Sequence, residues 1–137
     1  MSNKLTEFVF QRIGVPNFGK YLDLAAFRHK LVSGNIANAS TPGYRRQDID
    51  FKAEFEKMTG QSSRLVGSVS HPDHLPTGQH QLKPPRVHRT GVAEGEMNSV
   101  DIDREVSTLS QNELLFSAGA LLLQRKLDGL RKAITSR

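Results

Sequence analysis

The chain has 137 residues, the length of one small domain, and carries a formal net charge of +5. It contains no cysteine, which excludes disulfides, thiolate metal sites and a cysteine nucleophile. Only 36% of its residues are hydrophobic and tryptophan is absent, so the apolar surface available for a compact core is small. We therefore expect a single domain over residues 1–137 that needs partners to bury part of its apolar surface.

The first fifteen residues show no secretory signal. Their apolar residues are separated by charged and polar ones, and no small-residue cleavage site follows them. No stretch of the chain approaches the roughly 20 apolar residues that a membrane span requires. We expect no cleaved signal peptide and no direct membrane insertion, so that export would use another route.

A first amphipathic helix is predicted over residues 18–40. Apolar positions recur there at alternating steps of three and four, as on one face of an α-helix. Thr41-Pro42-Gly43 ends the pattern, because the residue before a proline avoids helical dihedral angles and glycine accepts a positive φ. The stripe consists of Leu22, Ala25, His29, Val32, Ile36 and Ala39.

The middle of the chain, residues 41–97, is rich in loop-forming residues. Residues 60–96 hold four of the six prolines and four of the five histidines. Runs typical of β-strands occur only at Leu65-Val66 and Arg86-Val87-His88. We expect a long loop-rich segment that holds at most a small β-hairpin.

A longer helix is predicted over residues 98–135. A four-three alternation of apolar residues, with one polar exception, runs through it and favours coiled-coil packing against the first helix. The expected fold is thus mainly α, with two long terminal helices packed as an antiparallel coiled-coil hairpin. Leu114, Leu115, Leu121 and Leu122 form a second apolar flank, which predicts self-assembly. The predicted seam is Ile102, Val106, Leu109, Glu113, Phe116, Ala120, Leu123, Leu127, Leu130 and Ile134.

Metal and catalytic sites are not indicated. His71, His74, His80 and His88 match no ligand spacing, and Pro72 prevents a helix that would place two of them on one face. No serine lies in a strand-turn-helix elbow, and no phosphate-binding loop has the required spacing. We expect no enzyme activity, no cofactor and no metal.

The most unusual local sequence is the segment from Asn35 to Tyr44. It combines small residues with two asparagines, Asn35 and Asn38, whose amides can donate and accept hydrogen bonds at once. This composition suits close docking of the helix end against a neighbour. An ordinary helix C-terminus followed by a turn explains the same residues, and on physical grounds alone it is the favoured reading.

Two blocks resemble the flagellar axial proteins of rod and hook. Asn35-Ile36-Ala37-Asn38-Ala39 with Thr41-Pro42-Gly43-Tyr44 is similar to the N-terminal signature of that family. The block from Asn98 to Glu105, followed by Asn112 and the heptad pattern, resembles the matching C-terminal region. The resemblance covers about residues 18–55 and 97–134. The short length and the step from Tyr44 to Phe51 are closest to a proximal rod subunit.

The resemblance implies a structural subunit of the proximal rod of the bacterial flagellar basal body. Such a subunit self-assembles through its terminal helices, transmits torque and forms the wall of the export channel, after export by the flagellar type III apparatus to a rod that spans the periplasm. Its implied partners are other rod proteins, copies of itself, and membrane-ring or export-gate adaptor proteins. The implied interface residues are Asn35, Ile36, Asn38, Thr41, Pro42, Gly43, Tyr44, Val106, Leu109, Phe116, Leu123, Leu127 and Leu130.

Three alternatives stay open on the sequence. The other short rod protein of the family is similar in size, but it typically carries an insertion between the asparagine motif and its tyrosine. A soluble helical adaptor or export chaperone would use the same helices to bind flagellar proteins transiently. A basic nucleic-acid binder would fit the net charge, but the basic residues are scattered and no aromatic residues lie among them, so we expect no nucleic-acid partner.

Overall fold

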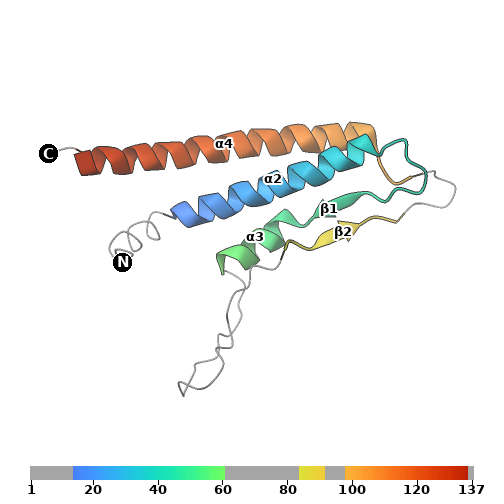
Figure 1. The fold of residues 1–137 in the computed structure, drawn as a ribbon, viewed down its shortest axis with the longest axis horizontal. Helices are drawn as coiled ribbons and strands as arrows, with labels where there is room; N and C mark the ends of the chain where they lie inside the picture. The colour runs from blue at the N-terminus through green and yellow to red at the C-terminus, as the bar shows by residue number, and fades with distance from the viewer. Residues whose placement is uncertain (1–13, 61–83, 92–97, 136–137) are drawn as a thin grey trace, which may run out of the picture.

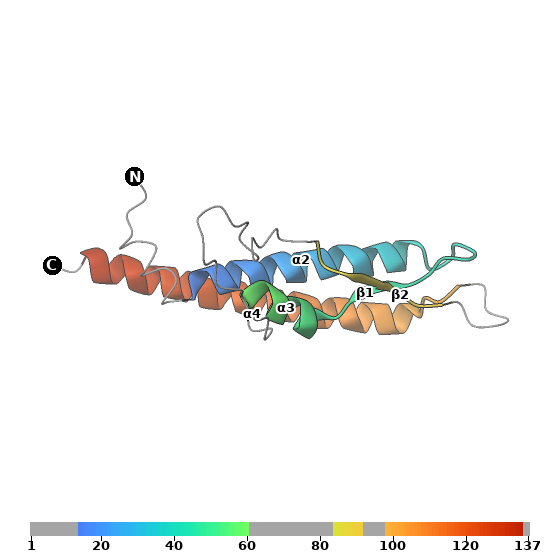
Figure 2. The ribbon, with the colours of Figure 1, turned by 90° about the horizontal axis from the view of Figure 1, so that it is seen from below.

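The computed structural model describes residues 14–60, 84–91 and 98–135. Two long helices, α2 (Val15–Ala37) and α4 (Ile102–Thr135), run side by side in opposite directions (Figure 1). The smaller elements β1 (Gln47–Ile49), α3 (Phe51–Thr59) and β2 (Val87–Arg89) lie together beside α2. The predicted antiparallel hairpin of terminal helices is thus confirmed, and Figure 2 shows the elongated shape that it gives the molecule.

Local residue choices explain where α2 begins and ends. Gly14, with φ of +75°, turns the chain into the helix, and Pro16 occupies the first turn, where its missing N–H is not needed. At the other end, Asn38 donates its side-chain amide to the Gly34 carbonyl over 2.8 Å. The helix therefore ends at Ala37, before the Thr41-Pro42-Gly43 turn.

The middle segment is more structured than predicted. β1 and β2 pair as an antiparallel two-stranded sheet, which confirms the expected β pairing and places one of the two predicted runs, Arg86-Val87-His88, at β2. The sequence analysis did not predict α3. Asp50 caps this helix by accepting from the Ala53 N–H over 3.0 Å, and Tyr21 of α2 packs edge-on against Phe51 and Phe55.

Some predicted features fall outside the described residues. Leu65-Val66, His71, His74 and His80 lie in the segment 61–83, so the structure adds nothing on them. His88 lies in β2 with an exposed side chain.

The face that α4 turns toward α2 is partly polar. Glu105, Asn112, Gly119 and Lys126, each seven residues from the next, all contact residues of α2 or of the turn before it. Asn112 donates to the Ala25 carbonyl over 2.9 Å. We call these four residues the polar seam.

The predicted apolar seam is therefore only partly correct as a description of the hairpin contact. Leu109, Leu123 and Leu130 are half-buried, but Val106 and Leu127 are 47% and 41% exposed. The face of α4 that contacts α2 is rotated about the helix axis by about one residue from the predicted seam. Glu105 and Asn112 find hydrogen-bond partners on α2, and Gly119 permits close approach of the two helices.

The buried apolar core is small and belongs to α2 and β1. Its members in the described residues are Leu24, Ala25, Val32 and Ile49. Among residues 14–60, 84–91 and 98–135, every large hydrophobic side chain that is clearly exposed lies on α4: Ile102, Val106, Leu114, Leu115, Phe116, Leu121, Leu122, Leu127 and Ile134. Among the described helices, none is long and apolar enough to cross a membrane.

Gly119 offers a test of the close helix contact. A Cβ atom added there would lie 3.1 Å from the Tyr21 ring, whereas at Gly129 it would meet nothing within 4 Å. Glutamine favours the helix over glycine by roughly 0.5–1 kcal/mol, but overpacking costs about 1–3 kcal/mol. We expect Gly119→Gln to lower the thermal midpoint of unfolding, measured by circular dichroism, and Gly129→Gln to raise it. Equal midpoints would contradict the contact.

Candidate functional site

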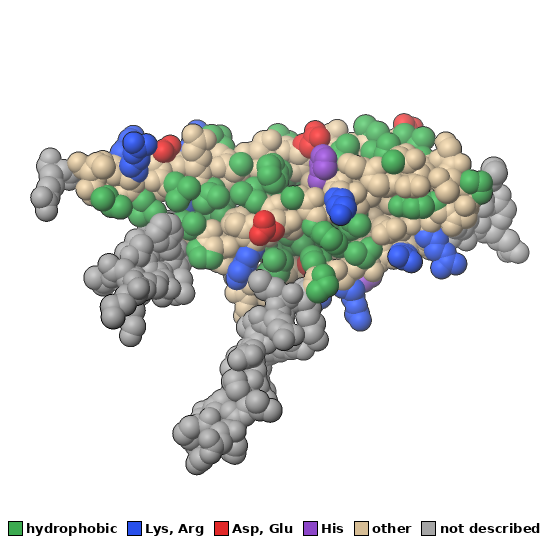
Figure 3. All heavy atoms as spheres, viewed as in Figure 1, with side chains coloured by type: hydrophobic (Ala, Val, Ile, Leu, Met, Phe, Trp, Pro, Cys, Tyr) green, Lys and Arg blue, Asp and Glu red, His purple; other side chains and the backbone are tan. Residues whose placement is uncertain are grey.

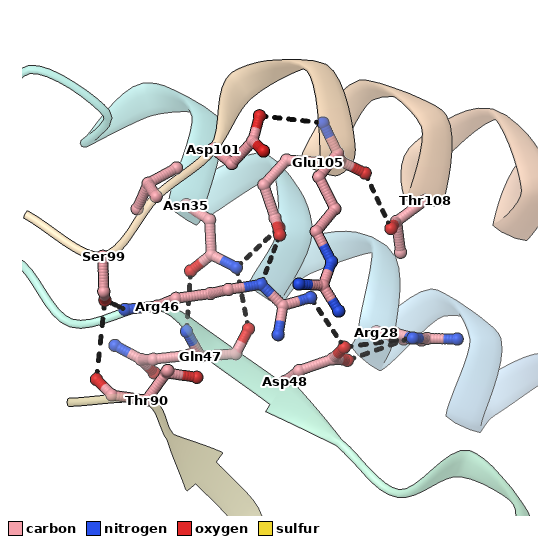
Figure 4. Close-up of polar contacts among 12 residues, drawn as sticks. Arg28, Asn35, Arg46, Gln47, Asp48, Thr90, Ser99, Asp101, Glu105 and Thr108 are labelled. Atoms are coloured by element: carbon pink, nitrogen blue, oxygen red, sulfur yellow. Dashed lines mark hydrogen bonds and ion pairs between the residues drawn. The ribbon is translucent and has the colours of Figure 1, made fainter. Parts of the chain in front are cut away.

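The side chain of Asn35 joins three elements at one end of the hairpin (Figure 4). Its Nδ2 donates to the Gln47 carbonyl of β1 and to Glu105 Oε2 of α4, each over 2.8 Å. Its Oδ1 accepts from the Gln47 N–H over 2.9 Å and from the Tyr44 hydroxyl over 3.3 Å. Asn35 is fully buried and uses both donors and both lone pairs, so its carboxamide is completely satisfied.

The bonds to Gln47 have the form of a β-ladder. The Asn35 carboxamide pairs with both the N–H and the C=O of one residue, as a residue of a neighbouring strand would. It therefore covers the edge of β1 that faces the helices. An aspartate could not replace it, because a carboxylate has no donor for the Gln47 carbonyl or for Glu105.

The Glu105 carboxylate has no exposed surface, but both of its oxygens have polar partners within the chain. Oε2 accepts from Asn35, and Oε1 forms an ion pair with the Arg46 Nε. Burial alone would lower the pKa of Arg46, but the hydrogen bonds and charges of Glu105 and Asp48 together outweigh burial and raise that pKa. A buried carboxylate with these two partners holds α4 against both α2 and β1.

Asp48 extends the pairing to the outer surface of α2. Its two oxygens accept from Arg28 Nε and Nη2 over 2.9 and 3.0 Å, which is the two-pronged geometry typical of strong arginine pairs. Its Oδ2 also accepts from Arg46 Nη2 over 3.0 Å. Burial raises the pKa of Asp48, but its hydrogen bonds and the two guanidinium charges outweigh burial and lower it below the ordinary 3.8. We call Arg28, Asn35, Arg46, Gln47, Asp48 and Glu105 the Asn35 cluster.

The segment before α4 is tied to the same place. Asn98 donates to the Ala39 carbonyl, and the Ser99 N–H donates to the Tyr44 carbonyl over 3.2 Å. Ser99 Oγ accepts from the Arg46 N–H over 2.8 Å. The two blocks that resemble the axial signature, far apart in sequence, therefore meet in space.

The structure separates the predicted interface residues into two groups. The first group lies at the end of α2 and in the following turn, where Asn35, Asn38 and Tyr44 make bonds within the chain while Thr41, Pro42 and Gly43 are exposed. The second group lies along α4. The structure does not bring the two groups into one surface. Glu105 of α4 contacts Asn35 of the first group, but it was not predicted as a site residue.

Arg28 was missed by the sequence analysis. Its spacing from Asn35 is seven residues, which places both on one helical face, but only the fold shows that Asp48 returns to that face. The Asn35 cluster has no free carboxylate or imidazole that could act on a substrate, since both of its acids are paired. Over the described ranges no group of three or more metal-ligating side chains occurs.

Comparison with known proteins gives a consistent family. The chain is 34% identical over 124 residues to the flagellar basal body rod protein FlgB of Salmonella typhimurium, a match that covers 82% of this chain and 86% of that protein. It is 30% identical over 125 residues to FlgB of Escherichia coli, covering 84% and 88%. The chain belongs to the FlgB family. FlgB of Aquifex aeolicus is 28% identical over 124 residues, covering 90% of this chain and 94% of that protein. No protein-family model matches the sequence.

Family membership decides several expectations. FlgB is a structural rod protein, so a chain of this family is a structural component of the flagellar basal body and not an enzyme. The matches name FlgB, so neither the other short rod protein nor an adaptor is favoured.

Removing the Asn35 carboxamide tests its role in this FlgB-family chain. Asn35→Ala leaves both backbone groups of Gln47 and one oxygen of Glu105 without a partner, at a cost of about 1–3 kcal/mol for each unsatisfied buried group. We expect a drop of at least about 3 kcal/mol in the free energy of unfolding, measured with urea. Asn38→Ala is the matched control, because it removes the bond to the Gly34 carbonyl and a longer, exposed bond from the Thr41 hydroxyl, and it should cost about 1 kcal/mol. A smaller loss for Asn35→Ala than for Asn38→Ala would contradict the assignment.

The lowered pKa of Asp48 predicts acid sensitivity. Because its folded pKa lies below its unfolded value, the ion pairs contribute fully above about pH 4 and their contribution is lost as the pH falls through the folded pKa. We expect Asp48→Asn to be less stable than wild type at pH 7 and to lose less stability between pH 5 and pH 2. The measurement is a series of thermal melts over that pH range. Parallel stability curves for the two proteins would contradict the prediction.

Proposed function

We propose that this chain builds the proximal rod of the flagellar basal body by self-assembly through its terminal helices, with α4 as the main contact between subunits. In this role the assembled wall surrounds the export channel and carries torque. The flagellar type III apparatus would export the chain, and the rod that it joins would span the periplasm. Its relatives' name, flagellar basal body rod protein, supports this function, and the surface of α4 supports this mode of assembly.

The observation that carries the proposal is the distribution of side chains around α4. The helix turns Glu105, Asn112 and Gly119 inward, where they are buried, and presents Leu114, Leu115, Leu121 and Leu122 outward. Monomeric proteins rarely expose contiguous apolar patches of this kind, and such patches mark contact surfaces. The space-filling view shows apolar side chains along much of the elongated body (Figure 3).

Helix lengths support the same conclusion. At 1.5 Å per residue the 34 residues of α4 span roughly 51 Å, against roughly 35 Å for the 23 residues of α2. The helix α2 cannot cover the whole of α4. Leu127 and Ile134 lie toward the end of α4 that is farthest from Glu105, and both are exposed.

In this proposal the predicted interface residues of α4 have two different roles. Leu109, Leu123 and Leu130 hold the hairpin together, while Val106 and Leu127 join the outer leucines in contacts with neighbouring subunits. Phe116 borders a shallow groove between α2 and α4, lined also by Ala26, His29, Asn112, Glu113 and Ser117. A side chain of a neighbour would fit beside the Phe116 ring. The exposed turn at Thr41, Pro42 and Gly43 belongs to the same contact region in our proposal.

The partners proposed for the chain are copies of itself, other rod proteins, and adaptor proteins of the membrane ring or export gate. An adaptor that binds transiently would need to release its partner, and a broad apolar face on a rigid helix favours lasting contact instead.

Charge placed on the outer face of α4 tests the proposal. Leu121→Asp and Leu122→Asp change side chains that are 48% and 50% exposed. The isolated chain should therefore keep its helical circular dichroism, and its free energy of unfolding should change by no more than about 0.5 kcal/mol. In the rod the same charge would be buried without a partner, which is costly. We expect loss of incorporation into purified hook–basal bodies and loss of swimming.

Gln124→Asp is the matched control, because it adds the same charge at an exposed polar position of α4 that is not part of the apolar surface. It should be incorporated normally. Full incorporation of both leucine variants would show that α4 does not supply the contact, whereas loss with all three variants would point to a general effect of acidic charge.

A further inference from the structure

The outer edge of β2 presents unpaired backbone groups. In the antiparallel register Asp48 pairs with His88, and the Thr90 N–H donates to the Arg46 carbonyl over 2.9 Å. Because hydrogen-bonded pairs alternate along such a ladder, the N–H and C=O groups of Val87 and Arg89 point away from β1. Within the described residues the sheet has two strands only, so these groups have no strand partner there.

At the opposite edge of the sheet, formed by β1, a side chain pairs with outward backbone groups. There the outward groups of Gln47 are taken up by the Asn35 carboxamide. The fold thus satisfies one edge with a side chain from α2 and leaves the other edge facing outward, where His88 and Arg89 are exposed.

Charge around the open edge is positive. Arg86, His88 and Arg89 are all exposed, and strand alternation places Arg86 and His88 on one face of β2 and Arg89 on the other. The acidic residue nearest in the ladder, Asp48, already accepts from Arg28 and Arg46. Basic side chains are visible along this lower part of the surface in Figure 3.

We propose that the outer edge of β2 binds an extended acidic segment of another protein, which adds a strand beside Val87 and Arg89. Backbone hydrogen bonds would give the contact its direction, and carboxylates on both faces of the added strand would meet the basic side chains. The inference depends on the proposed function only in that the partner is met in the assembled rod.

A second copy of β2 is a poor occupant of the same edge. Pairing two copies would bring the arginines of one strand beside those of the other, and like charges across a ladder are destabilising. Short charged edge strands preceded by prolines, here Pro84 and Pro85, are a known protection against such self-pairing. The same charges that prevent self-pairing select an acidic strand.

Site-specific crosslinking in assembled hook–basal bodies tests the proposal. A benzophenone amino acid is placed at His88, whose side chain is exposed and whose backbone pairs with β1, so the edge itself stays intact. After irradiation, the linked peptide is identified by mass spectrometry. We expect the linked peptide to be an acidic segment of a different protein, and we expect that segment to have an extended backbone conformation. A link to another copy of this chain, a link to a helix or a basic segment, or no link at all would overturn the proposal.

Variants at Arg89 separate charge from backbone. Arg89→Gln keeps the outward N–H and should reduce the crosslink yield roughly three-fold, whereas Arg89→Pro also removes the N–H and should reduce it by a further roughly five-fold. Arg89→Lys should retain the yield. The amount of chain incorporated is measured in the same preparation: if incorporation persists while the yield is the same for all variants, this inference fails and the proposed function stands.

Discussion

One carboxamide determines how the two halves of this protein meet. Asn35 reaches from α2 to both backbone groups of Gln47 and to the buried carboxylate of Glu105, and it has no donor or acceptor left over. The position of β1 on α2, and of α4 on both, follows from these bonds. Because each bond needs its own geometry, a shift of α4 along α2 would leave Glu105 buried without a partner. The cluster therefore fixes the register of the hairpin more strictly than apolar contacts could.

The same helix that buries polar groups exposes apolar ones. In the part of the chain that the structure describes, the buried core consists of a few side chains of α2 and β1, while the exposed large apolar side chains lie on α4. For a protein that acts alone this arrangement would be unfavourable. For a rod subunit this arrangement would be useful, since polar bonds orient α4 within the chain and the exposed leucines remain available for contacts with neighbouring subunits. The assembled state, and not the isolated chain, would hold the completed hydrophobic core.

Periodicity predicted the long elements well and their contacts less well. The step of three and four identified both helices. Their bounds were less exact: α4 ends at the predicted residue but begins four residues later than predicted, and α2 lies three residues before its predicted range at both ends. The seam was predicted from the apolar pattern, which contains Val106 and Leu127 but not the buried Asn112 and Gly119. Polar and glycine contacts carry no hydropathy signal, and their partners on α2 appear only in the fold. For the same reason α3, whose packing depends on Tyr21, was read as loop.

Buried ion pairs fix the relative orientation of the elements they join more than they add net stability, because the cost of removing charges from water offsets most of their attraction. In this chain Glu105, Arg46 and Asp48 form such a series, and their charges, with Arg28, sum to zero. The hairpin of an isolated subunit is then well oriented but supported by a small core. Burial of the outer leucines in the rod would add the missing hydrophobic term without changing the orientation that the Asn35 cluster has set. In such a rod the strongest apolar contacts of the subunit would be made with its neighbours, and the subunit would become more rigid on assembly.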